Sequence, residues 1–194
     1  MMIPRAVLRR GASLAALGFC LLVGPAAPRA EVRVSNFSVF LNDYDVTVHV
    51  VLLGAIPPTL QESLHSGIAT HLRLHVEFWQ HRNWGGDRRI HARTVERQVA
   101  YNVLTKEYKV SSLQGEQRDP FLTKDLREAQ RVVSEVRVHN LSPATALDSK
   151  ALYYVRVRSD VSLGGVNSWF SRMTGDAEET PWVQSSLLTL TRTQ

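Results

Sequence analysis

Histidine is the side chain of this sequence best suited to bind a metal ion, and His71, His75 and His81 lie near one another. They fall where apolar and polar residues alternate, which is typical of a strand with one buried face. Strand residues four positions apart are separated by about 13 Å, at roughly 3.3 Å per residue, so His71 and His75 cannot share one ion. A cross-strand partner such as His91, opposite His75 or His81, would be required. We expect solvated histidines on an outward face, with no metal and no cofactor.

The residue types that catalyse hydrolysis are present, but their spacing does not favour catalysis. Acid–base hydrolysis requires two carboxylates in one cleft, and acyl transfer requires a serine beside a base. The serines show no nucleophile elbow of the type Gly-x-Ser-x-Gly. Four aspartates occupy turn or cap contexts, where a carboxylate accepts hydrogen bonds from the backbone: Asp43, Asp87, Asp119 and Asp148. We therefore expect a protein that is not an enzyme, with a hydrolase of unknown substrate as the weaker alternative.

One predicted turn combines an aromatic residue with basic residues. Trp84 lies at its centre, and Arg82, Arg88 and Arg89 flank it. Tryptophan and arginine are enriched at the energetic centres of protein interfaces. The turn is therefore a candidate binding surface made of Arg82, Trp84, Asp87 and Arg88. In the competing interpretation, to which we give equal weight, Trp84 folds back onto its own hairpin and Asp87 pairs with a neighbouring arginine.

A second candidate surface lies between residues 164 and 180. Its apolar residues recur at near-helical spacing and precede an acidic stretch; they are Val166, Trp169, Phe170 and Met173. Such a segment can touch a membrane or a partner protein, or it can close the open end of a sandwich. We favour the closing role, because the acidic stretch would be repelled by anionic lipid. Trp169 and Phe170 would also contact an apolar or lipid-like ligand held between sheet and helices.

The Trp84 turn joins the two arms of a long predicted β-hairpin, Ile68 to Tyr101. The buried face of its first arm is expected to consist of Leu72, Leu74, Val76 and Phe78. On the second arm the apolar residues change parity after Ala92. This change predicts a β-bulge, an inserted residue that switches the exposed face, between Ala92 and Val95.

The rest of the chain reads as six further strands and two short helices. The strands are expected at 31–41, 44–53, 106–113, 134–141, 152–163 and 182–190. The first helix follows Pro57-Pro58, with either a capping box or a proline-started first turn, and ends at Gly67. The second starts at Asp119-Pro120 and aligns Leu122, Leu126, Ala129 and Val133. The pattern indicates a mainly β protein, an antiparallel β-sandwich of about eight strands with two covering helices.

The first 30 residues have the pattern of a secretory signal. Basic residues precede an apolar run, residues 14–23, that is too short to span a bilayer, and small residues follow it. We expect export to the periplasm and cleavage after Ala30, with Ala26 and Ala27 as alternative sites. An uncleaved signal that anchors the chain in the inner membrane is the other interpretation.

Cleavage would leave a single domain, residues 31–194. The one cysteine, Cys20, lies in the signal, so the mature domain would have no disulfide, thiolate nucleophile or cysteine-ligated metal. Removing four of the 23 basic residues and none of the 18 acidic ones lowers the formal net charge from +5 to +1. We therefore expect no nucleic-acid partner, because such partners require a clustered excess of Lys and Arg.

Four segments taken together resemble a family of exported proteobacterial proteins. They are LQESLHSGI (60–68), RNWGGDR (82–88), YNVLTKEYKV (101–110) and LYYVRV (152–157). Members often carry a more tryptophan-rich turn than this one, and the family is catalogued as a domain of unknown function. Genes for its members are frequently found near that of a nitrogen-regulation-type sensor kinase. The resemblance thus implies a link to envelope sensing, and it implies no reaction, ligand or site residue.

These observations favour an exported, non-enzymatic binding or adaptor module that acts through protein contacts. The expected partner is another envelope protein, and the resemblance suggests the sensory region of a kinase. Membrane contact is not favoured. The alternative from a different class is a carrier of an apolar or lipid-like ligand.

Overall fold

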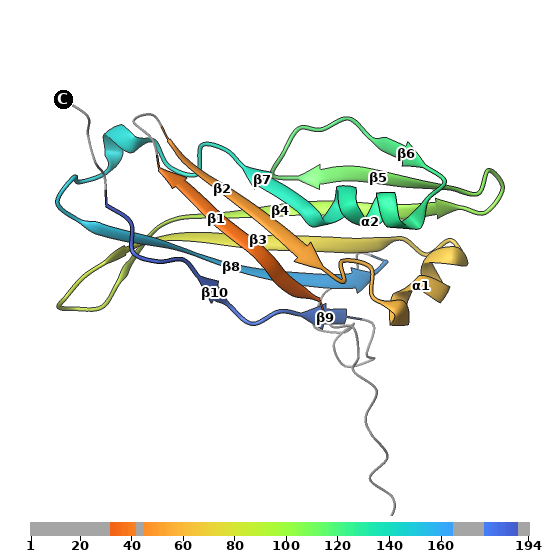
Figure 1. Cartoon of the computed structure of the whole chain (residues 1–194), viewed down its shortest axis with the longest axis horizontal. Coiled ribbons are helices and arrows are strands. Elements are labelled where there is room, and N and C mark those ends of the chain that lie inside the picture. Colours follow the sequence, from red (N-terminus) through yellow and green to blue (C-terminus); the bar gives the residue numbers. More distant parts are fainter. Residues whose placement is uncertain (1–31, 42–44, 165–176, 190–194) are drawn as a thin grey trace, which may run out of the picture.

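The computed structural model describes residues 32–41, 45–164 and 177–189, and this part of the chain is mainly β. A small antiparallel sheet has the strand order β1-β2-β7, and a large antiparallel sheet has the order β10-β8-β3-β4-β5-β6, with β9 on the β8 edge (Figure 1). The small sheet consists of β1 (Arg33–Leu41), β2 (Val46–Leu53) and β7 (Glu135–Val138). The large sheet consists of β3 (Thr70–His81), β4 (Arg88–Asn102), β5 (Glu107–Gln114), β6 (Phe121–Thr123), β8 (Leu152–Leu163), β9 (Ala177–Glu179) and β10 (Val183–Gln184).

Two helices, α1 (Pro58–His65) and α2 (Leu126–Ser134), and a 3-10 turn, η1 (Ala144–Ala146), complete the described elements. The expectation of a mainly β, antiparallel fold with two short helices is confirmed. Two strands more than the expected eight are present, because the short strands β6 and β9 gave no periodic signal. No helix of the described ranges is long and apolar enough to span a bilayer. The predicted secretory signal lies outside the described residues.

One hydrophobic core lies between the two sheets, where β1 and β2 cross the face of β3 and β8 (Figure 1). Alternate residues of each strand point into it, as period-2 patterning requires. The small sheet contributes Val46, Val48, Val50, Leu52, Val136 and Val138. The large sheet contributes Leu72, Leu74, Val76, Phe78, Val95, Val99, Val155, Val157 and Val161. The predicted buried face of the first hairpin arm is thus confirmed.

The β3–β4 hairpin is present, but its bulge is not where the pattern placed it. Phe78 pairs with His91 and Trp79 pairs with Arg89, so the inserted residue is Ile90. The predicted bulge between Ala92 and Val95 is therefore wrong. Ala92 is exposed, and so small a side chain does not indicate which face of a strand is buried.

Helix α1 matches its prediction, whereas α2 starts later than expected. Pro57 is the N-cap of α1 without a side-chain hydrogen bond, which is the proline-started alternative, and Gly67 follows the helix with φ +96°. In α2 the N-cap is Asp125, whose carboxylate accepts a hydrogen bond from the Arg127 N–H at 2.8 Å. The helix therefore does not start at Asp119-Pro120.

Strand pairing explains why α2 starts at a later residue than predicted. Residues 121–123 pair with β5 as strand β6, so Leu122 is 62% exposed and lies outside the apolar stripe of the helix. Asp119 and Asp125 are both suitable N-caps, and pairing with β5 removes the first of them from the helix.

A buried arginine joins the two sheets. Arg97 of β4 is only 2% exposed and lies on the core side of the sheet. Its guanidinium donates two hydrogen bonds to the Glu116 carboxylate, one of them at 2.8 Å. The Nη1 atom donates to the main-chain oxygens of Val132 and Glu135, both at 2.7 Å. One side chain therefore connects β4, the β5–β6 loop, the end of α2 and the start of β7.

Gly115 brings Glu116 within reach of this arginine. Its φ of +83° falls in the left-handed region that favours glycine. A Cβ atom at this position would lie 2.2 Å from the main-chain oxygen of Thr94. The loop and β4 therefore pack too closely for any side chain at position 115.

We predict that Arg97→Met lowers the free energy of unfolding by about 3–5 kcal/mol, because it leaves a partly buried carboxylate and several main-chain oxygens without their donor. Urea denaturation of purified protein measures the change. Arg118→Met is the matched control, since Arg118 is exposed and lies in the β5–β6 loop that carries Glu116. Equal stability of the two variants would contradict the role of Arg97.

Candidate functional site

The turn between β3 and β4, residues 82–88, here called the Trp84 tip, projects from one end of the large sheet (Figure 1). The Trp84 side chain is 90% exposed, so it does not fold back onto the hairpin. Arg82 and Arg88 are also exposed. Gly85 and Gly86 both have positive φ, at +81° and +79°, and they form the reversal of the chain. The turn thus presents an indole ring and two guanidinium groups to solvent.

Asp87 stabilises the Trp84 tip through the hydrogen bonds of its carboxylate. Its carboxylate accepts hydrogen bonds from the Arg82 N–H at 3.0 Å, from His81 Nδ1 at 3.1 Å and from the Tyr154 hydroxyl at 2.9 Å. The hydrogen bond from the Arg82 N–H, together with that from Tyr154, lowers the pKa of Asp87 below its ordinary value of 3.8. The competing interpretation paired Asp87 with an arginine side chain, but its carboxylate contacts a main-chain N–H, a histidine and a tyrosine, and so it fixes the turn.

A cluster centred on Glu77 supports the base of the hairpin. The Glu77 carboxylate accepts hydrogen bonds from Arg156 Nε at 2.6 Å, Arg89 Nη1 at 3.0 Å and Trp79 Nε1 at 3.0 Å. The Arg156 guanidinium lies over the rings of Trp79 and Trp182, at 4.4 and 4.7 Å from their centroids. Burial raises the pKa of Glu77, but the donated hydrogen bonds outweigh it and hold the pKa below 4.5.

The histidines of β3 belong to a ladder of alternating bases and acids on the outer face of the large sheet. His71 contacts Glu96 at 2.9 Å, and Arg73 contacts Glu96 at 3.2 Å and Asp160 at 3.6 Å. His75 Nε2 lies 2.9 Å from Asp160. Burial raises the pKa of Glu96, but hydrogen bonds from His71 and Arg73 outweigh this effect and hold the pKa below 4.5.

This ladder corrects two expectations about the histidines. His71 is only 8% exposed and paired with an acid, so the prediction of solvated histidines is wrong for this residue. His91 lies opposite Phe78 and not opposite His75 or His81. No group of three metal-ligating side chains occurs within residues 32–41, 45–164 and 177–189.

The ladder also contains a carboxylate, an imidazole and a hydroxyl in series. Asp160 contacts His75 Nε2, and His75 Nδ1 lies 3.1 Å from Thr94 Oγ1. This is the order of groups in a catalytic triad. Catalysis would also require a cleft for substrate and oxyanion donors, and neither cavity described below includes these residues.

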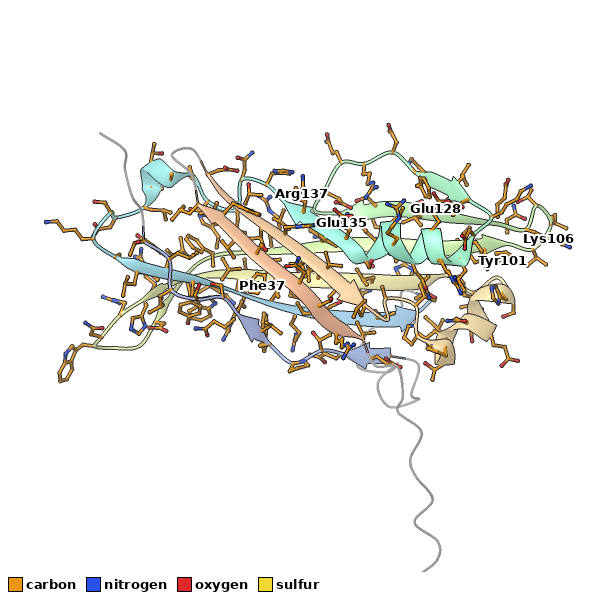
Figure 2. The ribbon with its side chains drawn as sticks, viewed as in Figure 1. Phe37, Tyr101, Lys106, Glu128, Glu135 and Arg137 are labelled. Atoms are coloured by element: carbon orange, nitrogen blue, oxygen red, sulfur yellow. The ribbon has the colours of Figure 1, made fainter. Side chains whose placement is uncertain are left out.

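Two cavities lie in the β4–β6 region. A groove of about 940 Å³ is lined by β4, the β5–β6 loop, α2 and β7. Figure 2 labels two of its residues, Glu135 and Arg137, on β7. A smaller cavity of about 470 Å³ lies at the β4–β5 turn, and it includes Tyr101 and Leu122.

Sequence reasoning missed the exposed apolar residues at that turn. Leu104 is 92% exposed, Val103 is 56% exposed, and both lie at the end of β4 opposite the Trp84 tip. Figure 2 labels Tyr101 and Lys106 beside them. The end of the predicted hairpin at Tyr101 and the next strand at 106–113 imply a turn between them, and no local pattern marks apolar residues in a turn as a surface. The predicted segment with Trp169 and Phe170 lies outside the described residues, so the carrier alternative stays an expectation.

Comparison with protein families assigns the chain. A family described as a domain of unknown function (DUF4390) matches residues 29–181. The chain belongs to this family. No curated protein and no solved structure matches it.

The DUF4390 match includes both ends of β4, the Trp84 tip and the groove, whereas Trp182 and β10 follow it. The expected resemblance to a domain of unknown function is therefore confirmed. Because the family carries no reaction or ligand, the role of each residue rests on its geometry.

We predict that acid destabilises the fold through Glu77 and Glu96. Both have folded-state pKa values below 4.5, so their contribution is fully present above pH 4.5 and is lost as the pH falls through the folded pKa values. Urea denaturation below pH 4.5 should show a steep loss of stability, and Glu77→Gln with Glu96→Gln should flatten it. Glu62→Gln, at an exposed position, is the control. An unchanged slope in the double variant would contradict this assignment.

Proposed function

We propose that this DUF4390 protein is an exported, non-enzymatic binding module of the periplasm. In this proposal a β-sandwich domain docks onto another envelope protein through the Trp84 tip. The secretory-signal pattern of the first 30 residues supports export.

The observation that carries the proposal is the exposure of Trp84 on a turn that is otherwise well held. Burying an indole is strongly favourable, and tryptophan is among the side chains that contribute most to protein interfaces. Asp87 fixes the turn with three hydrogen bonds, and Trp79 stacks on Tyr154 behind it with an interplanar angle of 4°. A turn ordered before binding loses little conformational entropy when it docks.

The charges of the tip define the chemistry of the partner. Arg82 and Arg88 are exposed, and Asp87 directs its carboxylate to groups of the hairpin and of β8. A complementary surface would have a pocket for the indole ring, with carboxylates around it. The partner that we propose is the sensory region of an envelope kinase.

The direct experiment is photo-crosslinking in living cells from position 84. Position 104 is the matched control, because Leu104 is also an exposed apolar residue of a β-turn, at the other end of β4. We expect a discrete protein adduct from position 84 only, identified by mass spectrometry. The same adduct from both positions, or no adduct from either, would remove the Trp84 tip as the docking element.

Binding measurements with the crosslinked partner give a quantitative prediction. Trp84→Ala should weaken the affinity by roughly 30-fold, the usual size of an interface hot spot. Arg82→Gln with Arg88→Gln should mainly slow association and reduce its dependence on salt. Leu104→Ala should change neither quantity. An affinity that survives Trp84→Ala would argue against the proposal.

A further inference from the structure

The groove beside α2 concentrates positive charge. Its lining contains five arginines and two glutamates, a formal charge of +3 on a chain whose net charge is only +5. The arginines come from β4, the β5–β6 loop, α2 and β7; they are Arg93, Arg97, Arg118, Arg131 and Arg137. We call this cavity the arginine groove.

Two of these arginines already have partners within the fold. Arg97 is neutralised by Glu116. Arg93 donates to the main-chain oxygens of His139 at 2.7 Å and Asn140 at 3.2 Å. Both side chains line the groove, but most of their N–H donors already bind groups of the protein.

The other three arginines are exposed and poorly compensated. Among the described residues, Arg118 and Arg137 make no ion pair, and Arg131 approaches only Glu128, at 3.9 Å. The second acid of the groove, Glu135, lies 3.3 Å from His49 on the neighbouring strand. No carboxylate of the described residues pairs with Arg118 or Arg137, and Arg131 is compensated only by its long contact with Glu128.

We propose that the arginine groove binds a small polyanion that carries at least two phosphate or carboxylate groups. A guanidinium group presents paired N–H donors that match the oxygens of either group. Arginines from three separate elements favour a ligand with more than one such group. The volume of about 940 Å³ suits a small molecule.

The geometry favours a small molecule over a peptide. β7 is an edge strand of the small sheet, and an extended peptide at a strand edge is usually held by main-chain hydrogen bonds. The main-chain oxygens of Glu135 and His139, at the two ends of this edge, already accept hydrogen bonds from Arg97 and Arg93. Both ends of this edge are therefore closed to strand addition, and the side chains of the groove are the main donors to a ligand.

The composition of the groove also disfavours a nucleic acid. Single strands are bound by stacking their bases on exposed aromatic rings. Apart from the imidazole ring of His139, Phe121 is the one aromatic residue of the lining, and it is partly buried against the core. This inference does not depend on the Trp84 tip.

Isothermal titration calorimetry at a fixed ionic strength of about 0.15 M tests the proposal, with inorganic pyrophosphate and citrate as the two probes. We expect saturable binding of at least one probe at a single site. Arg131→Gln with Arg137→Gln should weaken it by roughly 100-fold, about tenfold for each charged hydrogen-bonding group lost. Binding of pyrophosphate alone would assign a phosphate ligand, and binding of citrate alone a carboxylate ligand.

The matched control is Arg82→Gln with Arg88→Gln, which removes the same charge from the Trp84 tip and should leave the affinity within about twofold. Equal losses in both double variants would indicate non-specific attraction and overturn the proposal. Failure of both probes to bind would also overturn it, as would binding of a hexaglutamate peptide alone. Unfolding midpoints equal to that of the unaltered protein confirm that the variants are folded.

Discussion

Neutralisation of one buried charge holds the two sheets together. Removing a guanidinium group from water costs several kcal/mol unless its charge and its donors are satisfied. Glu116 neutralises Arg97, and the main-chain oxygens at the end of α2 and the start of β7 accept its remaining donors. Carbonyl groups at the end of a helix have no partner within the helix, so both requirements are met at one point. The same contacts position the walls of the arginine groove.

A second set of polar contacts stiffens the outer face of the large sheet. Glu77 collects donors from β3, β4 and β8, and the Arg156 guanidinium lies between the rings of Trp79 and Trp182. These contacts join the base of the hairpin to the segment that contains β9 and β10. Because the base is held by side chains on three strands, the hairpin can extend beyond the sheet and still keep an ordered turn. The exposed indole of Trp84 therefore lies on a turn whose base is fixed.

Some features of the fold could be predicted from the sequence, and others could not. Alternation identified the core face of β3, and two prolines identified the start of α1, because these signals are local. Two aspartates could each have capped α2, and only the pairing of residues 121–123 with β5 excludes the first. The position of the bulge at Ile90 was missed because Ala92 is small enough to occupy either face. Exposure of Trp84 could not be decided, since an indole at a turn can either fold back or project.

Most of the strands, most of the turns and the family resemblance follow from the sequence alone, since these depend on residue order over a few positions or on matching motifs. Which polar side chains meet depends on the tertiary structure. His71 contacts Glu96 across 25 positions, Arg97 reaches Val132 across 35, and His75 contacts Asp160 across 85. Such contacts depend on strand order and register, and a shift of one residue would turn each side chain to the other face. The acid–base ladder and the arginine groove are therefore properties of the fold, which no local pattern records.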